Sequence, residues 1–220
     1  MSIMEVRSVT YSYDGTKNVL NDISVSFEEG KVYAILGPSG CGKTTLLSLI
    51  GGLDVPTSGT ILFDGTDIQQ AGLEAHRSKH VSFIFQNYNL IDYMTPIENA
   101  ALSATKEAAG AALKRLGLTD SEIKRNVLKL SGGQQQRVAI ARALVADTRV
   151  ILADEPTGNV DDAMSVEITK ILKESAKETG KCVIIVTHSI DLAKEADTVF
   201  VLKNGVLQEQ KPAELETGSN

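Results

Sequence analysis

The sequence predicts an α/β protein with a mainly parallel sheet, an antiparallel β subdomain at the N-terminus and an inserted α-helical subdomain. Two observations carry this prediction. Short apolar runs at 31–36, 149–153 and 181–187 have the length of buried strands. Segments with helical patterns separate them, and strands that alternate with helices indicate parallel βαβ units. We therefore expect residues 1–220 to form a single domain.

Antiparallel strands are expected in the first third of the chain. Residues 4–13 alternate loosely between polar and apolar side chains, and Ile23, Val25 and Phe27 alternate with serines, as in half-buried strands. Residues 58–67 read as a strand pair, with Asp64-Gly65 as the turn.

Two helices are expected beside the parallel strands. Residues 44–53 carry leucine and isoleucine at helical spacing. Residues 161–178 place an apolar set on one face, namely Val166, Ile168, Ile171 and Leu172. At the end of the chain, Lys203-Asn204-Gly205 separates two short apolar runs, and Asn-Gly is a strong hairpin signal.

The stretch at 88–145 has a different character, because it is rich in Ala, Leu, Glu, Lys and Arg. We interpret it as the helical insertion. Breaks are expected near Pro96, Gly110, Gly117 and the Ser131-Gly132-Gly133 segment. His76 and His80, which precede it, are expected to be exposed and to have no role.

Composition excludes some classes of protein. The net charge is −6 with no basic block, so the overall field does not favour nucleic acid, and we expect no nucleic-acid partner. Cys41 and Cys182 are too few for a disulfide framework or a zinc site. No apolar run approaches the ~20 residues that span a bilayer. If the protein serves a membrane process, another chain supplies the membrane part.

A glycine-rich loop follows the first apolar run. Residues 37–44 match G-x-x-x-x-G-K-T, and a strand before the loop with a helix after it is the order that a P-loop requires. Backbone N–H groups of such a loop bind triphosphate, Lys43 reaches the β- and γ-phosphates, and Thr44 holds Mg²⁺. The loop therefore predicts a P-loop NTPase core that binds ATP and Mg²⁺. The predicted nucleotide-binding residues in and after this loop are Gly37, Pro38, Ser39, Gly40, Cys41, Gly42, Lys43, Thr44 and Thr45.

Two carboxylates end the apolar run at 150–153. Asp154 and Glu155 would lie at the carboxyl edge of the sheet, where open α/β sheets bind ligands. Asp154 can orient Mg²⁺, and Glu155 can poise a water for attack on the γ-phosphate. By itself this pair reads equally well as a strand followed by a helix cap, and the P-loop upstream shifts the balance to the functional reading.

The segment Leu130-Ser131-Gly132-Gly133-Gln134 is the third motif. Ser131 can cap a helix, and the two glycines leave backbone donors open at its start, which makes a second anion site. Local physical chemistry alone favours a plain helix cap.

Together these motifs resemble the nucleotide-binding subunit of ATP-binding cassette (ABC) transporters. Residues 37–44 match the family's Walker A loop, 150–154 with Glu155 match Walker B and the catalytic glutamate, and 130–134 match the signature sequence. Gln86 is similar to the Q-loop glutamine and His188 to the switch histidine. Asp161 ends a segment that looks like the D-loop, with Val160 where leucine is more usual. Tyr13 resembles the aromatic residue that stacks on adenine, with Tyr11 as the alternative.

The resemblance implies an ATPase that works as a head-to-tail dimer. Each ATP would lie between the Walker A loop of one copy and Ser131, Gly132, Gly133 and Gln134 of the other, with Asp161 crossing the interface. Gln86 would contact Mg²⁺ or the attacking water. His188 would hold Glu155 and the water, so that Glu155, His188, Gln86 and Lys43 form the catalytic set. Thr44, Gln86 and Asp154 would be the metal ligands.

The resemblance also implies a partner and a place in the cell. The partner would be a separate transmembrane permease, so the chain would work at the cytoplasmic face of the membrane. Residues 83–90 and 95–99 look like the group of macrolide, lipoprotein-releasing and antimicrobial-peptide transporters, which suggests export or extraction. The stretch between Gln86 and Leu130 is short for that group, which leaves the permease unidentified.

Two alternatives compete with this prediction. One is a soluble ABC ATPase that acts on ribosomes or DNA, but such proteins usually carry two cassettes or a long coiled coil, and neither pattern occurs here. The other is a GTP-binding switch, but the sequence has no Asn-Lys-x-Asp guanine-reading motif.

Overall fold

Two sheets organise the chain in a computed structural model that describes residues 2–211 and residue 215. The first is a four-stranded antiparallel sheet in the order β2-β1-β4-β5. Asp64 and Gly65 both have positive φ, so they form the predicted turn between β4 and β5. The strands are β1 (Ser2–Tyr11), β2 (Leu20–Glu28), β4 (Ser58–Phe63) and β5 (Thr66–Asp67).

The second sheet has six strands in the order β10-β9-β3-β8-β7-β6. All neighbouring pairs are parallel except β9 and β10, which form the predicted hairpin around Asn204 and Gly205. The fold class predicted from the sequence is confirmed. The strands are β3 (Val32–Leu36), β6 (Val81–Ile84), β7 (Val150–Asp154), β8 (Cys182–Thr187), β9 (Thr198–Lys203) and β10 (Val206–Gln210).

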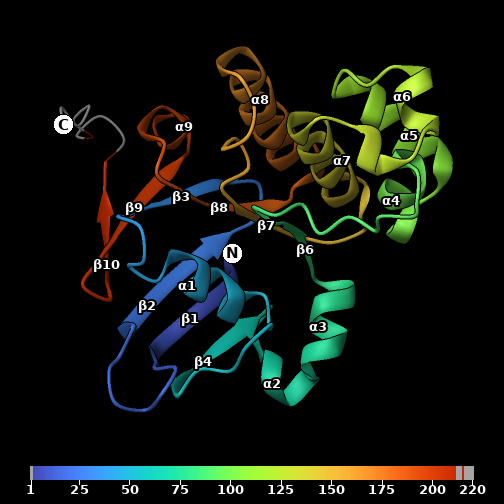
Figure 1. Ribbon diagram of the computed structural model, residues 1–220. Helices are drawn as coiled ribbons and strands as arrows, with labels where there is room; N and C mark the ends of the chain where they lie inside the picture. Colours follow the sequence, from blue (N-terminus) through green and yellow to red (C-terminus); the bar gives the residue numbers. More distant parts are fainter. Residues whose placement is uncertain (1, 212–214, 216–220) are drawn as a thin grey trace.

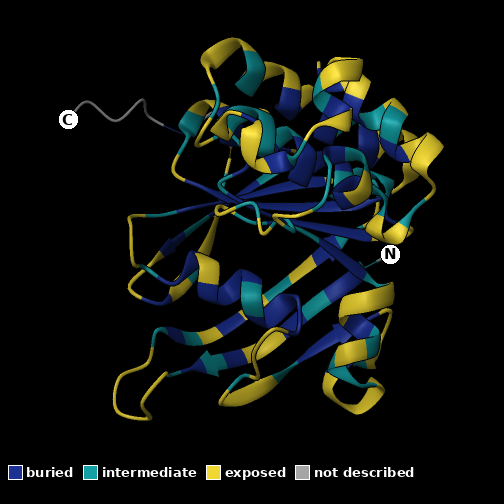
Figure 2. Cartoon of the chain, turned by 45° about the vertical axis from the view of Figure 1, so that its right-hand side comes forward, coloured by how far each residue is buried: buried dark blue, intermediate teal, exposed yellow. Residues whose placement is uncertain are grey.

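The parallel sheet lies between two hydrophobic cores, because both of its faces are covered by other elements. Val32, Ala34 and Leu36 of β3 face the core that contains α7 (Gly132–Val145), α8 (Asp162–Thr179) and α9 (Ile190–Lys194). Tyr33 and Ile35 face the other core, which α1 (Lys43–Ile50) and the antiparallel sheet complete. Figures 1 and 2 show these layers: the buried strands lie in the middle, and α1 and α7 lie on opposite faces.

The segment at 88–145 is mostly helical, as predicted. Pro96 begins α4, Gly117 follows α5 with a φ of 78°, and Ser131 caps α7. The predicted break at Gly110 is wrong, because this glycine lies inside α5, whose Ala109 and Leu113 are buried in the core and hold the helix together. The remaining short elements are α4 (Pro96–Ala100), the 3-10 turn Ala101–Ser103, α5 (Lys106–Arg115), α6 (Asp120–Lys124) and the 3-10 turn Val127–Lys129.

Two further helices, α2 (Ile68–Ala71) and α3 (Leu73–Lys79), are absent from the predicted elements. They correct the expectation for the histidines. His76 is fully buried and its Nε2 lies 3.0 Å from the carbonyl oxygen of Ile50, the last residue of α1. His80 is half-buried and stacks on Phe63 with ring centroids 4.0 Å apart. Burial lowers the pKa of His76 to about 4, so its ring is neutral at pH 7.

The predicted apolar face of α8 is wrong in one residue. Ile168, Ile171 and Leu172 are buried, but Val166 is 71% exposed. Two residues along a helix correspond to about 200° of rotation, so Val166 lies on the side opposite Ile168. In the described ranges, 2–211 and 215, no helix has the length and apolar character needed to cross a bilayer.

Candidate nucleotide-binding site

The site is built at the carboxyl edge of the parallel sheet. Strand register aligns the ends of four strands: Leu36 pairs with Thr187, Val186 with Asp154, and Ala153 with Ile84. Residues that follow these pairs therefore leave the sheet at one edge. That edge gathers the loop at 37–42, Glu155, His188 and Gln86.

The glycine-rich loop joins β3 to α1, as the sequence predicts. Gly40 and Gly42 have φ of 75° and 105°, which glycine adopts without strain. At Gly37, a Cβ would lie 2.5 Å from the carbonyl oxygen of Leu202, so only glycine fits beside β9. Gly42 is the N-cap of α1 and offers no side chain to cap it. The first N–H groups of α1 are therefore left to an anion.

Two side chains at the start of α1 reach across the loop and the sheet edge. Lys43 is buried, and its Nζ donates to the carbonyl oxygens of Gly37 at 2.7 Å and Pro38 at 3.1 Å. Thr44 Oγ1 donates to Asp154 Oδ2 at 2.9 Å. Burial raises the pKa of the Asp154 carboxyl, and the Thr44 hydrogen bond opposes that shift.

Tyr13 lies against the same helix. Its hydroxyl is 2.7 Å from Thr45 Oγ1, its ring meets Tyr11 edge to face, and it is 71% exposed. Tyr11 is buried and its hydroxyl bonds Asp54, which raises the pKa of Tyr11 to about 12. Of the two tyrosines, Tyr13 is therefore the one with a ring face open to a ligand.

Glu155 is fixed by three contacts. Its φ is 48°, an unusual value for this residue type, and its backbone N–H donates to the Val186 carbonyl oxygen at 2.9 Å. Oε2 accepts from Thr187 Oγ1 at 3.0 Å, and Oε1 lies 2.9 Å from His188 Nδ1. The His188 side chain is 74% exposed and that of Glu155 12%. The carboxylate thus lies at the carboxyl edge of the sheet with a histidine beside it.

The sequence predictions missed Thr187, which is fully buried and orients Glu155. A hydroxyl residue at the end of a buried strand, directly before His188, was the available signal. They also missed Arg142 of α7, which donates to the carbonyl oxygens of Tyr88 at 2.9 Å and Asn89 at 2.6 Å. Tyr88 and Asn89 both have positive φ, so Arg142 holds the strained backbone that follows Gln86. Gln86 itself is exposed.

The motif at 130–134 starts α7 on the opposite side of the sheet from α1. Ser131 Oγ accepts from the Gln134 N–H at 3.3 Å, and Gln134 Oε1 accepts from the Ser131 N–H at 2.9 Å, which is a capping box. Within the described ranges, no hydrogen bond joins Ser131 or Gln134 to the loop at 37–44. Asp161 serves a different helix, since its Oδ1 accepts from the Met164 N–H and caps α8. One chain therefore holds two candidate anion sites that it does not combine.

Comparison with known proteins identifies the family. The sequence profile of the family described as ABC transporter matches residues 20–158. The chain is 44% identical to the uncharacterized ABC transporter ATP-binding protein YclH of Bacillus subtilis, over 93% of this chain and 95% of that protein. It is 39% identical to the lipoprotein-releasing system ATP-binding protein LolD 2 of Chlorobium chlorochromatii, covering 96% and 94% of the two chains. Against the macrolide export ATP-binding/permease protein MacB of Syntrophobacter fumaroxidans the identity is 37%, and the match spans 32% of that protein.

Solved structures agree with the sequence relatives. The dimeric structure of the ABC transporter cassette MJ0796 superposes with a TM-score of 0.89 at 36% identity, covering 95% of this chain and 98% of that one. A post-hydrolysis state of the same cassette, bound to ADP and Pi, superposes with a TM-score of 0.87. The family predicted from the motifs is confirmed. The chain belongs to the ABC transporter family, and it is an ATP-binding and ATP-hydrolysing cassette of that family.

Proposed function

We propose that two copies of this chain pack head to tail around two ATP molecules and drive a separate membrane permease. The observation that carries the proposal is the separation of its two anion sites. One set of residues converges at the carboxyl edge of the parallel sheet: Lys43, Thr44, Asp154, Glu155 and His188. Ser131 instead caps α7, which packs in the core on the face of the sheet opposite α1. A second copy would bring the two together.

The loop at 37–42 and the first turn of α1 bind the phosphates in this proposal. Lys43 exchanges its bonds to the Gly37 and Pro38 carbonyls for phosphate oxygens. Thr44 and Thr45 follow at the helix N-terminus, where the dipole favours negative charge. Tyr13 covers the adenine with its exposed ring.

Magnesium fits the oxygen atoms at this edge. Thr44 Oγ1 and Asp154 Oδ2 are 2.9 Å apart, and hydroxyl and carboxylate oxygens suit Mg²⁺. Gln86, which follows the neighbouring strand β6, completes the proposed set. When bound, the ion neutralises charge between the β- and γ-phosphates.

Hydrolysis follows from the fixed carboxylate of Glu155. Glu155 accepts a proton from a water that attacks the γ-phosphorus in line, and the bond to the β-phosphate oxygen breaks to leave ADP. Thr187 and His188 hold the two oxygens of that carboxylate. His188 also reaches the γ-phosphate, because most of its side chain is exposed.

The second copy closes the site with the start of α7. Ser131 and the N–H groups of Gly132 and Gly133 bind the γ-phosphate, and Gln134 caps Ser131. At Gly133, a Cβ would meet the Asn159 carbonyl oxygen at 3.2 Å, so the loop before Asp161 packs against this helix start. Asp161 then lies where the two copies meet.

The partner and location rest on the relatives. LolD and MacB are named for lipoprotein release and macrolide export, and MacB joins its cassette to a permease in one chain. We infer one cassette domain over residues 1–220, with 88–145 as its helical subdomain, bound to a permease at the cytoplasmic face of the membrane. Export or extraction of a hydrophobic compound, peptide or lipoprotein is the proposed task. The alternative, a soluble ABC ATPase of ribosomes or DNA, gains no support from these relatives.

Two variants test the proposal. Glu155→Gln is expected to abolish hydrolysis while ATP gives a dimer on size-exclusion chromatography. Ser131→Arg in that background is expected to bind ATP as a monomer without forming the dimer, because a bulky cation fills the γ-phosphate site. Rapid turnover by Glu155→Gln would remove this residue from the base role, and normal dimerisation of the double variant would refute the head-to-tail arrangement.

A further inference from the structure

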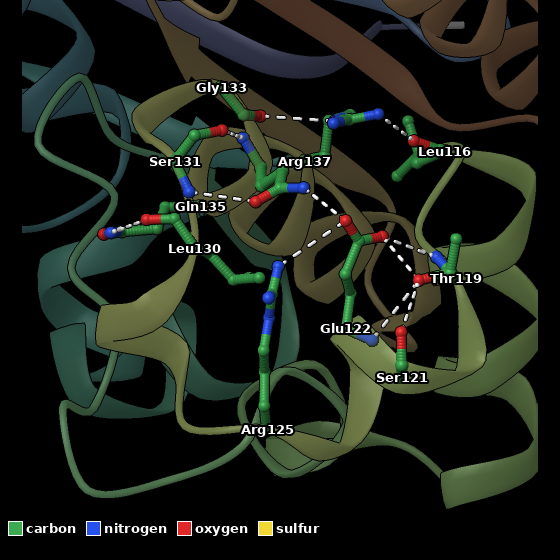
Figure 3. A network of polar contacts seen from close by, with 11 residues as sticks. Leu116, Thr119, Ser121, Glu122, Arg125, Leu130, Ser131, Gly133, Gln135 and Arg137 are labelled. Carbon is green, nitrogen blue, oxygen red and sulfur yellow. Dashed lines mark hydrogen bonds and ion pairs between the residues drawn. The ribbon is translucent and has the colours of Figure 1, made fainter.

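Glu122 of α6 lies at the junction between α6 and the start of α7 (Figure 3). Its Oε2 accepts from the backbone N–H and the hydroxyl of Thr119, each at 2.8 Å, which closes the capping box of α6. Its Oε1 accepts from Gln134 Nε2 at 2.5 Å, and Arg125 lies 3.5 Å from the same oxygen. One carboxylate therefore caps its own helix and reaches the first turn of another.

The contact with Gln134 decides how the Gln134 amide is turned. An ionised carboxylate only accepts hydrogen bonds, so the NH₂ group of Gln134 must face Glu122. The hydrogen bonds from Thr119 and the nearby Arg125 hold the pKa of Glu122 below its usual value, which keeps it ionised at neutral pH. Gln134 Oε1 is then left to face the Ser131 N–H, which it accepts at 2.9 Å. The reverse orientation would place two acceptors against each other at Glu122 and two donors against each other at Ser131.

The orientation of the Gln134 amide in turn holds the backbone of Ser131, because Gln134 Oε1 accepts from the Ser131 N–H. Ser131 Oγ accepts from the Gln134 backbone N–H, so one lone pair faces the helix and its hydroxyl hydrogen is left to donate outward. Arg137 steadies the same turn, since its guanidinium donates to the carbonyl oxygens of Gly133 and Leu116 at 3.3 and 3.0 Å.

We infer that Glu122 is a positioning residue for ATP-dependent dimerisation, which acts by holding the Gln134 amide in the orientation that presents Ser131 to the γ-phosphate. This inference rests on the proposed head-to-tail dimer. It assigns a role to α6, a helix that contributes no residue to the motifs of the family.

The test uses the Glu155→Gln background, in which dimers accumulate with ATP. Glu122→Ala is expected to raise the ATP concentration for half-maximal dimerisation by roughly tenfold, the usual consequence of losing a charge-assisted hydrogen bond. Binding of a fluorescent ATP analogue to the monomer, at protein concentrations below dimerisation, is expected to stay unchanged. In the active protein with Glu155 restored, the same substitution is expected to raise KM and leave kcat within about twofold.

Matched variants separate positioning from stability of α6. Thr119→Ala removes the hydroxyl that caps α6 and keeps the Glu122–Gln134 bond, so dimerisation is expected to stay within about twofold of the parent. Asp120→Ala, in the same helix, loses an ion pair with Lys114 and keeps the Glu122–Gln134 bond, so it is expected to behave likewise. In a Gln134→Ala background, Glu122→Ala should add no further loss.

Each contrary result has a separate meaning. If Thr119→Ala weakens dimerisation as much as Glu122→Ala, or if the effect of Glu122→Ala persists without Gln134, the inference is wrong. Absence of any ATP-dependent dimer in the Glu155→Gln parent would instead overturn the proposed function, and the inference would fall with it.

Discussion

At the scale of single residues, the Thr187 hydroxyl makes two hydrogen bonds, one of which orients Glu155. The hydroxyl donates to Glu155 Oε2 and accepts from the Ser189 N–H at 3.1 Å, and the Thr187 side chain is fully buried. Valine has the same shape without the hydroxyl. Thr187→Val is therefore expected to lower kcat on the order of tenfold, because a carboxylate held at one oxygen in place of two is less well aimed at the water.

Steady-state ATPase assays and nucleotide titrations check this prediction. ATP affinity should be unchanged, since Thr187 lies behind Glu155 rather than at the phosphate loop. Thr169→Val is the matched control, because it removes a hydroxyl that bonds the Ser165 carbonyl within α8, away from the site. An unaltered kcat in Thr187→Val would show that His188 alone orients Glu155.

The buried carboxylate of Asp154 lowers the stability of the folded protein, which is a second effect at the scale of one residue. Asp154 is 8% exposed, and burial raises the pKa of its carboxyl above the unfolded value. Asp154→Asn is expected to raise the melting temperature of the nucleotide-free protein by about 2–4 °C at pH 7, equivalent to ~1 kcal/mol for a chain of this size. ATP hydrolysis should be lost, because the proposed magnesium ligand loses its charge.

The pH dependence of that difference has a definite sign. Between the unfolded and folded pKa values of Asp154, the folded state binds more protons, so this group lowers stability as pH rises through that window. The advantage of Asp154→Asn should therefore be full at pH 7 and should shrink as the pH falls toward 4 and below. Thermal melts of both proteins across that range measure it, and a gap that widens in acid would contradict the assignment.

At the scale of elements, replacing a glycine by alanine is expected to have opposite effects on stability inside α5 and at the end of α1. Gly110 lies within α5, and a Cβ there would make ordinary contact with Ile97 Cδ1 at 3.7 Å. Gly110→Ala is expected to stabilise the protein by about 0.5–1 kcal/mol, because alanine loses less backbone entropy in a helix. Gly51 follows α1 as its C-cap, and a Cβ there would lie 1.9 Å from the ring of Phe83.

Gly51→Ala is therefore expected to destabilise the protein by about 1–3 kcal/mol through overpacking. Urea unfolding curves of the two variants, followed by circular dichroism, give both values. A destabilised Gly110→Ala would mean that α5 needs its glycine for a reason other than space. An unchanged midpoint for Gly51→Ala would mean that Phe83 moves freely.

At the scale of the whole molecule, the proposed head-to-tail dimer predicts that stability in the presence of ATP depends on protein concentration. With ATP, the Glu155→Gln variant should show a melting temperature that rises by roughly 2 °C or more for a tenfold rise in protein concentration, because a dimer is favoured by mass action. With ADP, which lacks the γ-phosphate that Ser131 would bind, the melting temperature should rise above that of the free protein without depending on concentration. Equal concentration dependence with both nucleotides would argue against a γ-phosphate contact between copies.

The sequence by itself determined the parts of this protein that depend on neighbours along the chain. Gly42 before Lys43, Ser131 before Gln134 and the Asn204-Gly205 turn are local geometries, and each lies where the sequence predicted it. The order of strands, glycine loop and helices also follows from local periodicity, which is why the fold class could be predicted, whereas the family was predicted from the resemblance of the motifs to a known family.

Only the tertiary structure decided which side chains are buried and which residues of separate elements contact each other. His76 is buried because α3 packs on the end of α1, and Val166 is exposed because the register of α8 turns it outward. Thr187 and Glu122 acquire their roles through contacts with residues 32 and 12 positions away, Glu155 and Gln134. Sequence periodicity reports which side chains share a face, whereas hydrogen bonds between separate elements depend on packing, and packing exists only once the chain has folded.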